Sequence, residues 1–265
     1  MSKRVIGIGL SLLLSAFLVP FCKESAAADS QTRIIYYGDS LAAEAAPYLQ
    51  SQLTQSGRAT MVNRTYPGSS PCDWKPAVNL DLSRGMPQAV IIETFGNNIS
   101  SCQLVGGKRI PSGSAQYWNM YKKDLTLLMN RFSSKTKIWL VAPPAAKNDL
   151  SGSGSAKSSH KRSMMYLMNT LAAARQNTWA LDAGAAVEGP GGTYSPYLAC
   201  LPLEACLGSG VWEGLNRVRA LDGLHFCPTI ISATIDQLRH CPVYASGAYR
   251  FATAQAIPII NNLGL

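Results

Sequence analysis

Short apolar runs alternate with segments of helical spacing along most of this 265-residue chain. The apolar runs lie at residues 33–37, 60–63, 88–94, 137–142 and 179–181, and the helical segments at residues 42–55, 114–132, 162–176 and 248–261. Residues 89–92 are apolar without a break, which is typical of a strand covered on both faces. The alternation predicts a three-layer α/β/α sandwich around a central, mainly parallel five-stranded sheet. In such a sheet the chemistry gathers at the carboxyl ends of the strands.

Three features interrupt this alternation. Residues 147–161 are rich in Ser, Gly and Lys and are predicted to form a mobile surface loop that contains His160. Residues 183–221 show no clear pattern, and a connection of this length usually shapes a site. Pro258 is expected to interrupt the last turns of the final helix.

The first residues have the pattern of an export signal. Lys3 and Arg4 precede a nearly continuous apolar run over residues 5–21, and three alanines stand at residues 26–28. The pattern predicts a cleaved signal peptide over residues 1–28 and a single domain over residues 29–265. An uncleaved membrane anchor is the alternative reading of the same run.

Six cysteines follow this segment, and an even number in an oxidising compartment favours disulfides over free thiols. They are Cys72, Cys102, Cys200, Cys206, Cys227 and Cys241. The sequence alone permits fifteen pairings of six cysteines. No CxxC spacing occurs, so we expect no zinc site.

The formal net charge is +9, but the basic residues are scattered along the chain. Without a basic helix that carries interleaved aromatics, nucleic-acid binding is not expected. Attraction to an anionic cell envelope or polysaccharide fits the charge, and a merely soluble surface fits it equally well.

Residues 38–41 read Gly-Asp-Ser-Leu and stand between the first predicted strand and the first predicted helix. This position presents Ser40 at the edge of the sheet, near a helix N-terminus whose dipole favours developing negative charge. The alternative is that Asp39 and Ser40 only cap the helix, because both residue types are favoured there.

Asp222 stands three residues before His225 near the C-terminus. At this spacing the carboxylate can bind one imidazole nitrogen while the other faces a nucleophile, as a serine hydroxyl requires. Of the other histidines, His160 falls in the predicted loop and His240 lies beside Cys241. His225 is therefore the predicted general base.

Together these motifs resemble the SGNH family of GDSL-type hydrolases over nearly the whole chain. Four of the family's sequence blocks follow in order. The first is residues 38–41, the second contributes Gly68, the third lies within residues 95–98 (Phe-Gly-Asn-Asn), and the last is residues 222–225. The third block departs from the family's usual Gly-x-Asn-Asp.

The resemblance implies a flavodoxin-like SGNH fold and a role for each motif. Ser40 would be the nucleophile, His225 the general base and Asp222 the residue that holds the histidine's tautomer. The oxyanion hole would consist of the backbone amides of Ser40 and Gly68 with one asparagine side chain. Alignment from the preceding strand makes that asparagine Asn97, which we favour, and alignment on the preceding glycine makes it Asn98.

The same resemblance suggests a disulfide pattern. Cys72 and Cys102 follow the two loops that would flank the oxyanion hole, so a bridge between them would brace its walls. Cys200 and Cys206 are close enough to close a small loop, and a Cys227–Cys241 bridge would enclose residues 228–240.

The expected function is that of a secreted, monomeric serine esterase that needs no metal or cofactor. Its substrate would be a small-molecule or glycan ester with a short acyl group such as acetyl, carried by a carbohydrate or a lipid, since loops such as residues 189–197 are rich in Gly, Ser and Tyr. An O-acyltransferase acting on envelope glycans would use the same residues. A non-catalytic cell-wall binding protein on a hydrolase scaffold is the alternative from another class.

Overall fold

The computed structural model describes residues 31–147, 159–207, 213–229 and 241–265. The predicted signal peptide lies outside these residues. Strands β1 (Thr32–Gly38), β2 (Ala59–Thr65), β3 (Ala89–Glu93), β6 (Lys137–Val141) and β7 (Thr178–Leu181) form one parallel sheet in the order β2-β1-β3-β6-β7. The predicted five-stranded parallel sheet is therefore confirmed.

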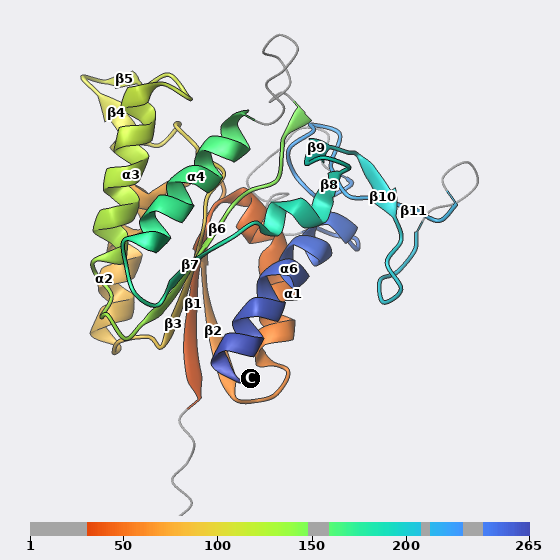
Figure 1. Cartoon of the computed structure of the whole chain (residues 1–265), viewed down its shortest axis with the longest axis horizontal. Helices are drawn as coiled ribbons and strands as arrows, with labels where there is room; N and C mark the ends of the chain where they lie inside the picture. The colour runs from red at the N-terminus through yellow and green to blue at the C-terminus, as the bar shows by residue number, and fades with distance from the viewer. Residues whose placement is uncertain (1–30, 148–158, 208–212, 230–240) are drawn as a thin grey trace, which may run out of the picture.

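Helices cover both faces of this sheet, as Figure 1 shows. They are α1 (Ser40–Thr54), α2 (Lys75–Ser83), α3 (Ala115–Met129), α4 (Ser159–Ala173) and α6 (Ser246–Leu263). Alternate side chains of β1 enter two separate cores: Ile34 and Tyr36 pack with α1 and α6, whereas Ile35 and Tyr37 pack with α2, α3 and α4. Burial on both faces explains why the strands read as continuous apolar runs rather than alternating ones.

The carboxyl ends of the strands meet at one edge of the sheet. Gly38 pairs with Thr65 across β1 and β2, and Glu93 pairs with Val141 across β3 and β6. The loops that follow β1, β2 and β3 therefore converge at this edge, where the motifs of the sequence lie.

Two segments differ from the sequence predictions. Helix α2 was not predicted, because it buries little besides Val78 and Asp81 and so has no clear apolar stripe. Helix α6 is not interrupted by Pro258 but continues to Leu263 and ends at Gly264. A proline in a helix removes a single backbone N–H donor, and buried neighbours such as Ile259 hold the last turns against the sheet.

The stretch after β7 is not structureless. It forms a 3₁₀ turn (Ala183–Val187) and two small hairpins, β8 (Glu188–Gly189) with β9 (Thr193–Tyr194) and β10 (Tyr197–Ala199) with β11 (Leu215–Arg217). A third hairpin joins β4 (Leu104–Val105) to β5 (Lys108–Arg109).

The structure contains the three disulfides that were predicted: Cys72–Cys102, Cys200–Cys206 and Cys227–Cys241. Within the described ranges, none of the helices combines the length and the apolar character needed to cross a membrane.

Candidate active site

Ser40 is the first residue of α1 and lies directly after β1. Asp39 caps the helix, since its Oδ1 accepts a hydrogen bond from the Leu41 N–H at 3.1 Å. Asp39 is therefore the cap of the helix, and Ser40 is the residue that follows the cap. Ser40 is 6% exposed, and its position at the helix N-terminus favours negative charge on or near its hydroxyl.

His225 joins Ser40 to Asp222 in one chain of hydrogen bonds. His225 Nε2 lies 2.9 Å from Ser40 Oγ, and His225 Nδ1 lies 2.5 Å from Asp222 Oδ2. Asp222 Oδ1 also accepts the backbone N–H groups of Leu224 and His225, at 2.9 and 3.0 Å, which fixes the turn between acid and imidazole. The structure thus brings together three residues that the sequence places up to 185 positions apart.

The carboxyl group of Asp222 stays ionised. Burial opposes its charge, but the hydrogen bonds from His225 and from the Leu224 N–H outweigh burial and lower the pKa of Asp222 to about 2. A permanent carboxylate at Nδ1 keeps the proton on that nitrogen and leaves Nε2 as the acceptor toward Ser40.

Glu44, one helical turn after Ser40, binds the backbone that directly follows His225. Its Oε2 accepts the backbone N–H groups of Phe226 and Cys227 at 2.7 and 2.8 Å, directly after His225. Burial raises the pKa of Glu44 to about 7, although the charge of His225 and these two N–H groups act in the opposite direction. No pattern in the sequence indicates this role, because a single acid in an alanine-rich helix is usually exposed.

The loop after β2 provides a second possible donor beside Ser40. Gly68 has φ of +77°, a left-handed conformation, and an added Cβ would lie 3.0 Å from Ile99 Cδ1. The Tyr66 N–H donates to the Gly38 carbonyl at 2.8 Å, which holds this loop against the β1–α1 turn. Within the described residues, no acceptor is found for the backbone N–H of Ser40 or of Gly68.

The two asparagines after β3 point to different partners. Asn97 Nδ2 donates to Asp39 Oδ2 at 3.1 Å and to the Ser69 carbonyl at 3.2 Å, so its amide lies between the loops after β1 and β2. Asn98 Nδ2 donates to the Ile110 carbonyl at 2.9 Å, on the segment between β5 and α3. Asn97 is therefore the asparagine whose side chain shares contacts with the Ser40 loop.

A buried acid pair lies beneath this arrangement. Asp39 Oδ2 accepts the Phe95 N–H at 2.6 Å, in addition to the Asn97 amide. Burial raises the pKa of Glu93 well above its ordinary value, and the neighbouring charge of Asp39 raises it further. Burial also raises the pKa of Asp39, but the N–H groups of Phe95 and Leu41 oppose that rise, so the proton of the pair lies on Glu93.

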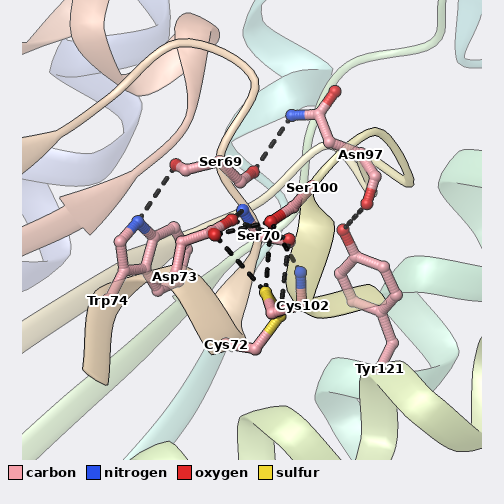
Figure 2. The surroundings of a disulfide bond; sticks show 9 residues. All are labelled: Ser69, Ser70, Cys72, Asp73, Trp74, Asn97, Ser100, Cys102 and Tyr121. Atoms are coloured by element: carbon pink, nitrogen blue, oxygen red, sulfur yellow. Dashed lines mark hydrogen bonds between the residues drawn. A yellow bond between two sulfur atoms is a disulfide. The ribbon is translucent and has the colours of Figure 1, made fainter. Parts of the chain in front are cut away.

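The Cys72–Cys102 disulfide ties the loop after β2 to the loop after β3 (Figure 2), with the two α-carbons 6.1 Å apart. Asp73 reinforces the tie: its Oδ1 accepts the Ser100 hydroxyl at 2.5 Å and its Oδ2 accepts the Ser70 N–H at 2.9 Å. Among the described residues, the grouping spaced to hold a metal ion is Cys72, Asp73 and Cys102. Its two sulfurs are bonded to each other, so they do not offer thiolate ligands.

His160 does not lie in a surface loop, and that prediction is wrong. Ser159, His160 and Lys161 form the first turn of α4, where they follow directly on a Ser- and Gly-rich segment that hides the helix start. His160 Nε2 lies 2.6 Å from the Phe95 carbonyl, so this histidine contacts the loop that carries Asn97. His240, the third candidate, lies outside the described residues.

Comparisons with known proteins agree with this fold. A family model described as "Protein of unknown function (DUF459)" matches residues 33–229. No curated protein sequence matches the chain.

Three solved structures resemble the chain over almost its whole length. A lipase/acylhydrolase from Enterococcus faecalis has a TM-score of 0.55 at 14% identity and covers 88% of this chain and 97% of its own. An alpha/beta hydrolase from the metagenome of Lake Arreo, Spain, has a TM-score of 0.53 at 13% identity, with 89% and 96% covered. A catalytic mutant of an acetylxylan esterase from Geobacillus stearothermophilus has a TM-score of 0.51 at 13% identity, with 89% and 95% covered. The SGNH-type fold expected from the sequence is thereby confirmed.

Proposed function

The chain belongs to the DUF459 family of proteins of unknown function, and from its fold and site geometry we propose that it is a serine esterase. One observation carries the proposal: Ser40, His225 and Asp222 form a continuous hydrogen-bonded chain at the carboxyl edge of the sheet. A helix cap alone would not require a histidine and an acid at these distances. The same three groups perform acyl transfer on several unrelated folds.

In the proposed reaction, Ser40 Oγ attacks the carbonyl carbon of an ester while His225 Nε2 takes the hydroxyl proton. His225 then gives this proton to the departing alcohol, which leaves an acyl group on Ser40. Water attacks the acyl-serine while His225 Nε2 takes its proton; His225 then returns this proton to Ser40 Oγ as the bond to the acyl group breaks, and the carboxylic acid departs. Asp222 stabilises the imidazolium in both steps without taking its proton.

We propose that the backbone N–H groups of Ser40 and Gly68 and the Asn97 amide bind the oxyanion that forms at the carbonyl oxygen. Asn97 is preferred to Asn98, because its amide lies between the loops after β1 and β2, whereas the Asn98 amide is directed at the Ile110 carbonyl between β5 and α3. An oxyanion beside Gly68 would compete for the longer of the two Asn97 bonds, the one of 3.2 Å to Ser69. Loss of one such donor typically lowers kcat by about 10²–10³.

We also propose that the protein is exported and acts as a monomer on small or glycan-linked esters of short acids. The signal-like N-terminus and the three disulfides support export. Two features support an acetylated carbohydrate as substrate. One of the structural neighbours is an acetylxylan esterase, and the strands of the β8–β9 hairpin carry small and polar residues such as Gly189 and Thr193.

Hydrolysis of p-nitrophenyl acetate tests the proposal. Ser40→Ala should fold normally and lower turnover by several orders of magnitude, because it removes the attacking oxygen. Ser83→Ala, an exposed serine at the end of α2, is the matched control and should keep full activity. Rapid quenching of the wild type should trap an acetyl group on the peptide that contains Ser40.

The outcomes separate the alternatives. Turnover that survives Ser40→Ala contradicts the assignment of the nucleophile, and absence of turnover in the wild type on every ester tested favours the non-catalytic binding protein. A competing sugar acceptor that receives acetyl faster than water does would identify an O-acyltransferase with the same intermediate.

A further inference from the structure

Three consecutive backbone carbonyls of the loop after β3 are each bound by a side chain from outside the loop. The Phe95 carbonyl contacts His160 Nε2 at 2.6 Å, on α4. The Gly96 carbonyl accepts the Tyr117 hydroxyl, and the Asn97 carbonyl accepts the Tyr121 hydroxyl at 2.6 Å, both on α3. Tyr117 and Tyr121 stand four positions apart and so lie on the same face of their helix.

All three side chains act as donors toward this loop. Tyr117 and Tyr121 are fully buried, and burial raises the pKa of both phenols, so each keeps its O–H. A carbonyl oxygen can only accept a hydrogen bond, so the proton of His160 sits on Nε2. The ring of His160 also stacks on Phe95 at 5.2 Å and lies 5.2 Å from the ring of Trp118.

We call Tyr117, Tyr121 and His160, which bind the carbonyls of residues 95–97, the carbonyl clamp. The sequence of the loop is compatible with this clamp. Gly96 has φ of +106°, and an added Cβ would lie 2.3 Å from the Tyr117 hydroxyl oxygen and 2.5 Å from His160 Nε2. A side chain at residue 96 would therefore displace two of the three donors. The close approach of Tyr117 and His160 requires glycine here as much as the backbone conformation does.

Asp39 holds the other side of the same loop. Its Oδ2 accepts the Phe95 N–H at 2.6 Å and the Asn97 side-chain amide at 3.1 Å. The donors of the loop thus face the residue before Ser40, and its carbonyls face α3 and α4. With both sides bound, the Asn97 side chain is confined to one position relative to Ser40.

We propose that Tyr117, Tyr121 and His160 are positioning residues that hold residues 95–97 so that the Asn97 amide is in place when the oxyanion forms. This inference rests on the proposed esterase function. A hydrogen-bond donor stabilises an oxyanion most when it already points at the place where the charge forms. Residues that hold such a donor rigidly therefore contribute to catalysis without contacting the substrate.

Tyr121→Phe gives the sharpest test, because it keeps the ring and removes one hydrogen bond. We expect kcat and kcat/KM for p-nitrophenyl acetate to fall together by at least about tenfold while KM stays within about threefold, as for an interaction that acts in the transition state. Tyr117→Phe should behave in the same way.

The matched control is Tyr37→Phe. Tyr37 is also fully buried and its hydroxyl donates to Asp81 Oδ2 at 2.8 Å, on α2 and away from residues 95–97. This variant should lower the melting temperature by an amount similar to the Tyr121 variant but leave kcat unchanged. The comparison separates loss of a buried hydrogen bond from loss of positioning.

Variants of His160 provide a second test of the positioning role. They test it even if Tyr121→Phe or Tyr117→Phe fails to fold. His160→Ala should lower kcat by at least about tenfold, whereas His160→Gln, whose amide N–H can bind the Phe95 carbonyl, should recover activity to within about threefold of the wild type. Ser40-dependent turnover in the wild type must be established first, since its absence would refute the esterase rather than the clamp. The positioning role is refuted if the wild type is active and every folded variant among Tyr121→Phe, Tyr117→Phe and His160→Ala has the same kcat as Tyr37→Phe.

Discussion

At the scale of single residues, the ionisation of the Asp222 carboxyl group affects how the activity depends on pH. Because its pKa is lowered to about 2, it remains a carboxylate over the whole range in which an esterase is assayed. The hydrogen bond between Asp222 and His225 Nδ1 should therefore persist over this range, and Asp222 should add no inflection of its own to the pH profile. The measurement is kcat/KM as a function of pH between pH 4.5 and 9, in buffers of equal ionic strength.

Replacement of the acid tests the same chain of bonds. Asp222→Asn should keep the fold and lower kcat by about 10³–10⁴, because an amide at this position favours the wrong histidine tautomer. Asp124→Asn, on α3 and outside this chain of bonds, is the control and should change kcat little. Equal activities of the two variants would mean that Asp222 does not orient His225.

Glu44 predicts a pH dependence of stability rather than of turnover. Its carboxyl has a pKa near 4.5 in ordinary surroundings and about 7 in the folded protein. Between these values the folded chain keeps a proton that the unfolded chain releases, so this group's contribution to stability is full below pH 4.5 and is lost as pH rises through 7. The difference corresponds to about 3 kcal/mol.

Glu44→Gln removes this titration and keeps an oxygen that can accept the N–H groups of Phe226 and Cys227. The charged groups that act on Glu44 are His225, Asp222 and Arg219, and all three remain in the variant. Urea unfolding at pH 4.5 and at pH 8 should show the free energy of unfolding shifting in favour of the variant by about 3 kcal/mol at the higher pH. A pH-independent difference would show that folding leaves the pKa of Glu44 near its ordinary value.

At the scale of helices, strands and loops, the Cys72–Cys102 bridge should affect catalysis as well as stability. It closes a span of 30 residues and joins the loops that carry Gly68 and Asn97. The double variant Cys72→Ala/Cys102→Ala should lose about 3–4 kcal/mol of stability by loop entropy and also lose kcat, since the proposed donors are no longer held together.

The Cys200–Cys206 bridge offers the matched control, because it spans 6 residues in the segment before β11. Its double alanine variant should lose only about 2 kcal/mol and keep the kcat of the wild type. Thermal unfolding and kcat would be measured well below both melting temperatures. If both double variants keep full kcat, the Cys72–Cys102 bridge is structural only.

Elements that could be predicted from the sequence are those whose pattern is local. The inner strands β1, β3 and β6 are recognisable because burial on two faces demands apolar runs, as at Ile91 and Leu140. The edge strands β2 and β7 are partly exposed, and their runs are shorter. Helix α2 lacks such a pattern, and the start of α4 is obscured by the polar residues before His160. These segments depend on contacts with distant parts of the fold, such as those of Asp81 with Arg64 and of His160 with Phe95, which the local pattern does not show.

The site shows the same division. Ser40, Asp222 and His225 stand in short motifs with characteristic spacing, so they can be predicted from the sequence. Glu44 contacts a backbone 182 residues away, and the Tyr121 hydroxyl binds a carbonyl of another loop. Supports of this kind leave no spacing signal, because their partners are main-chain atoms that every residue carries.

At the scale of the whole molecule, the arrangement of helices bears on substrate size. The described helices α1 to α4 and α6 all pack against the two faces of the sheet, so within the described residues no helix covers the carboxyl edge as an apolar lid. The hairpins beside that edge carry polar and small residues, as in the Glu188–Gly189 and Thr193–Tyr194 strands. A long acyl chain would find little apolar surface to bury there, and each unburied CH₂ forgoes about 0.8 kcal/mol of binding.

We therefore expect kcat/KM for p-nitrophenyl esters to be highest with acetate and to fall through butyrate and octanoate to dodecanoate. Spontaneous hydrolysis of each ester is subtracted with the Ser40→Ala variant, and every ester is kept below the concentration at which it forms micelles. A short-chain optimum should be accompanied by release of acetate from acetylated polysaccharide, with the same loss in the Ser40 variant. A rate that rises steadily from acetate to dodecanoate would instead mean that an apolar acyl site exists, and the preference for small, carbohydrate-linked acyl groups would be wrong even though the serine mechanism stood.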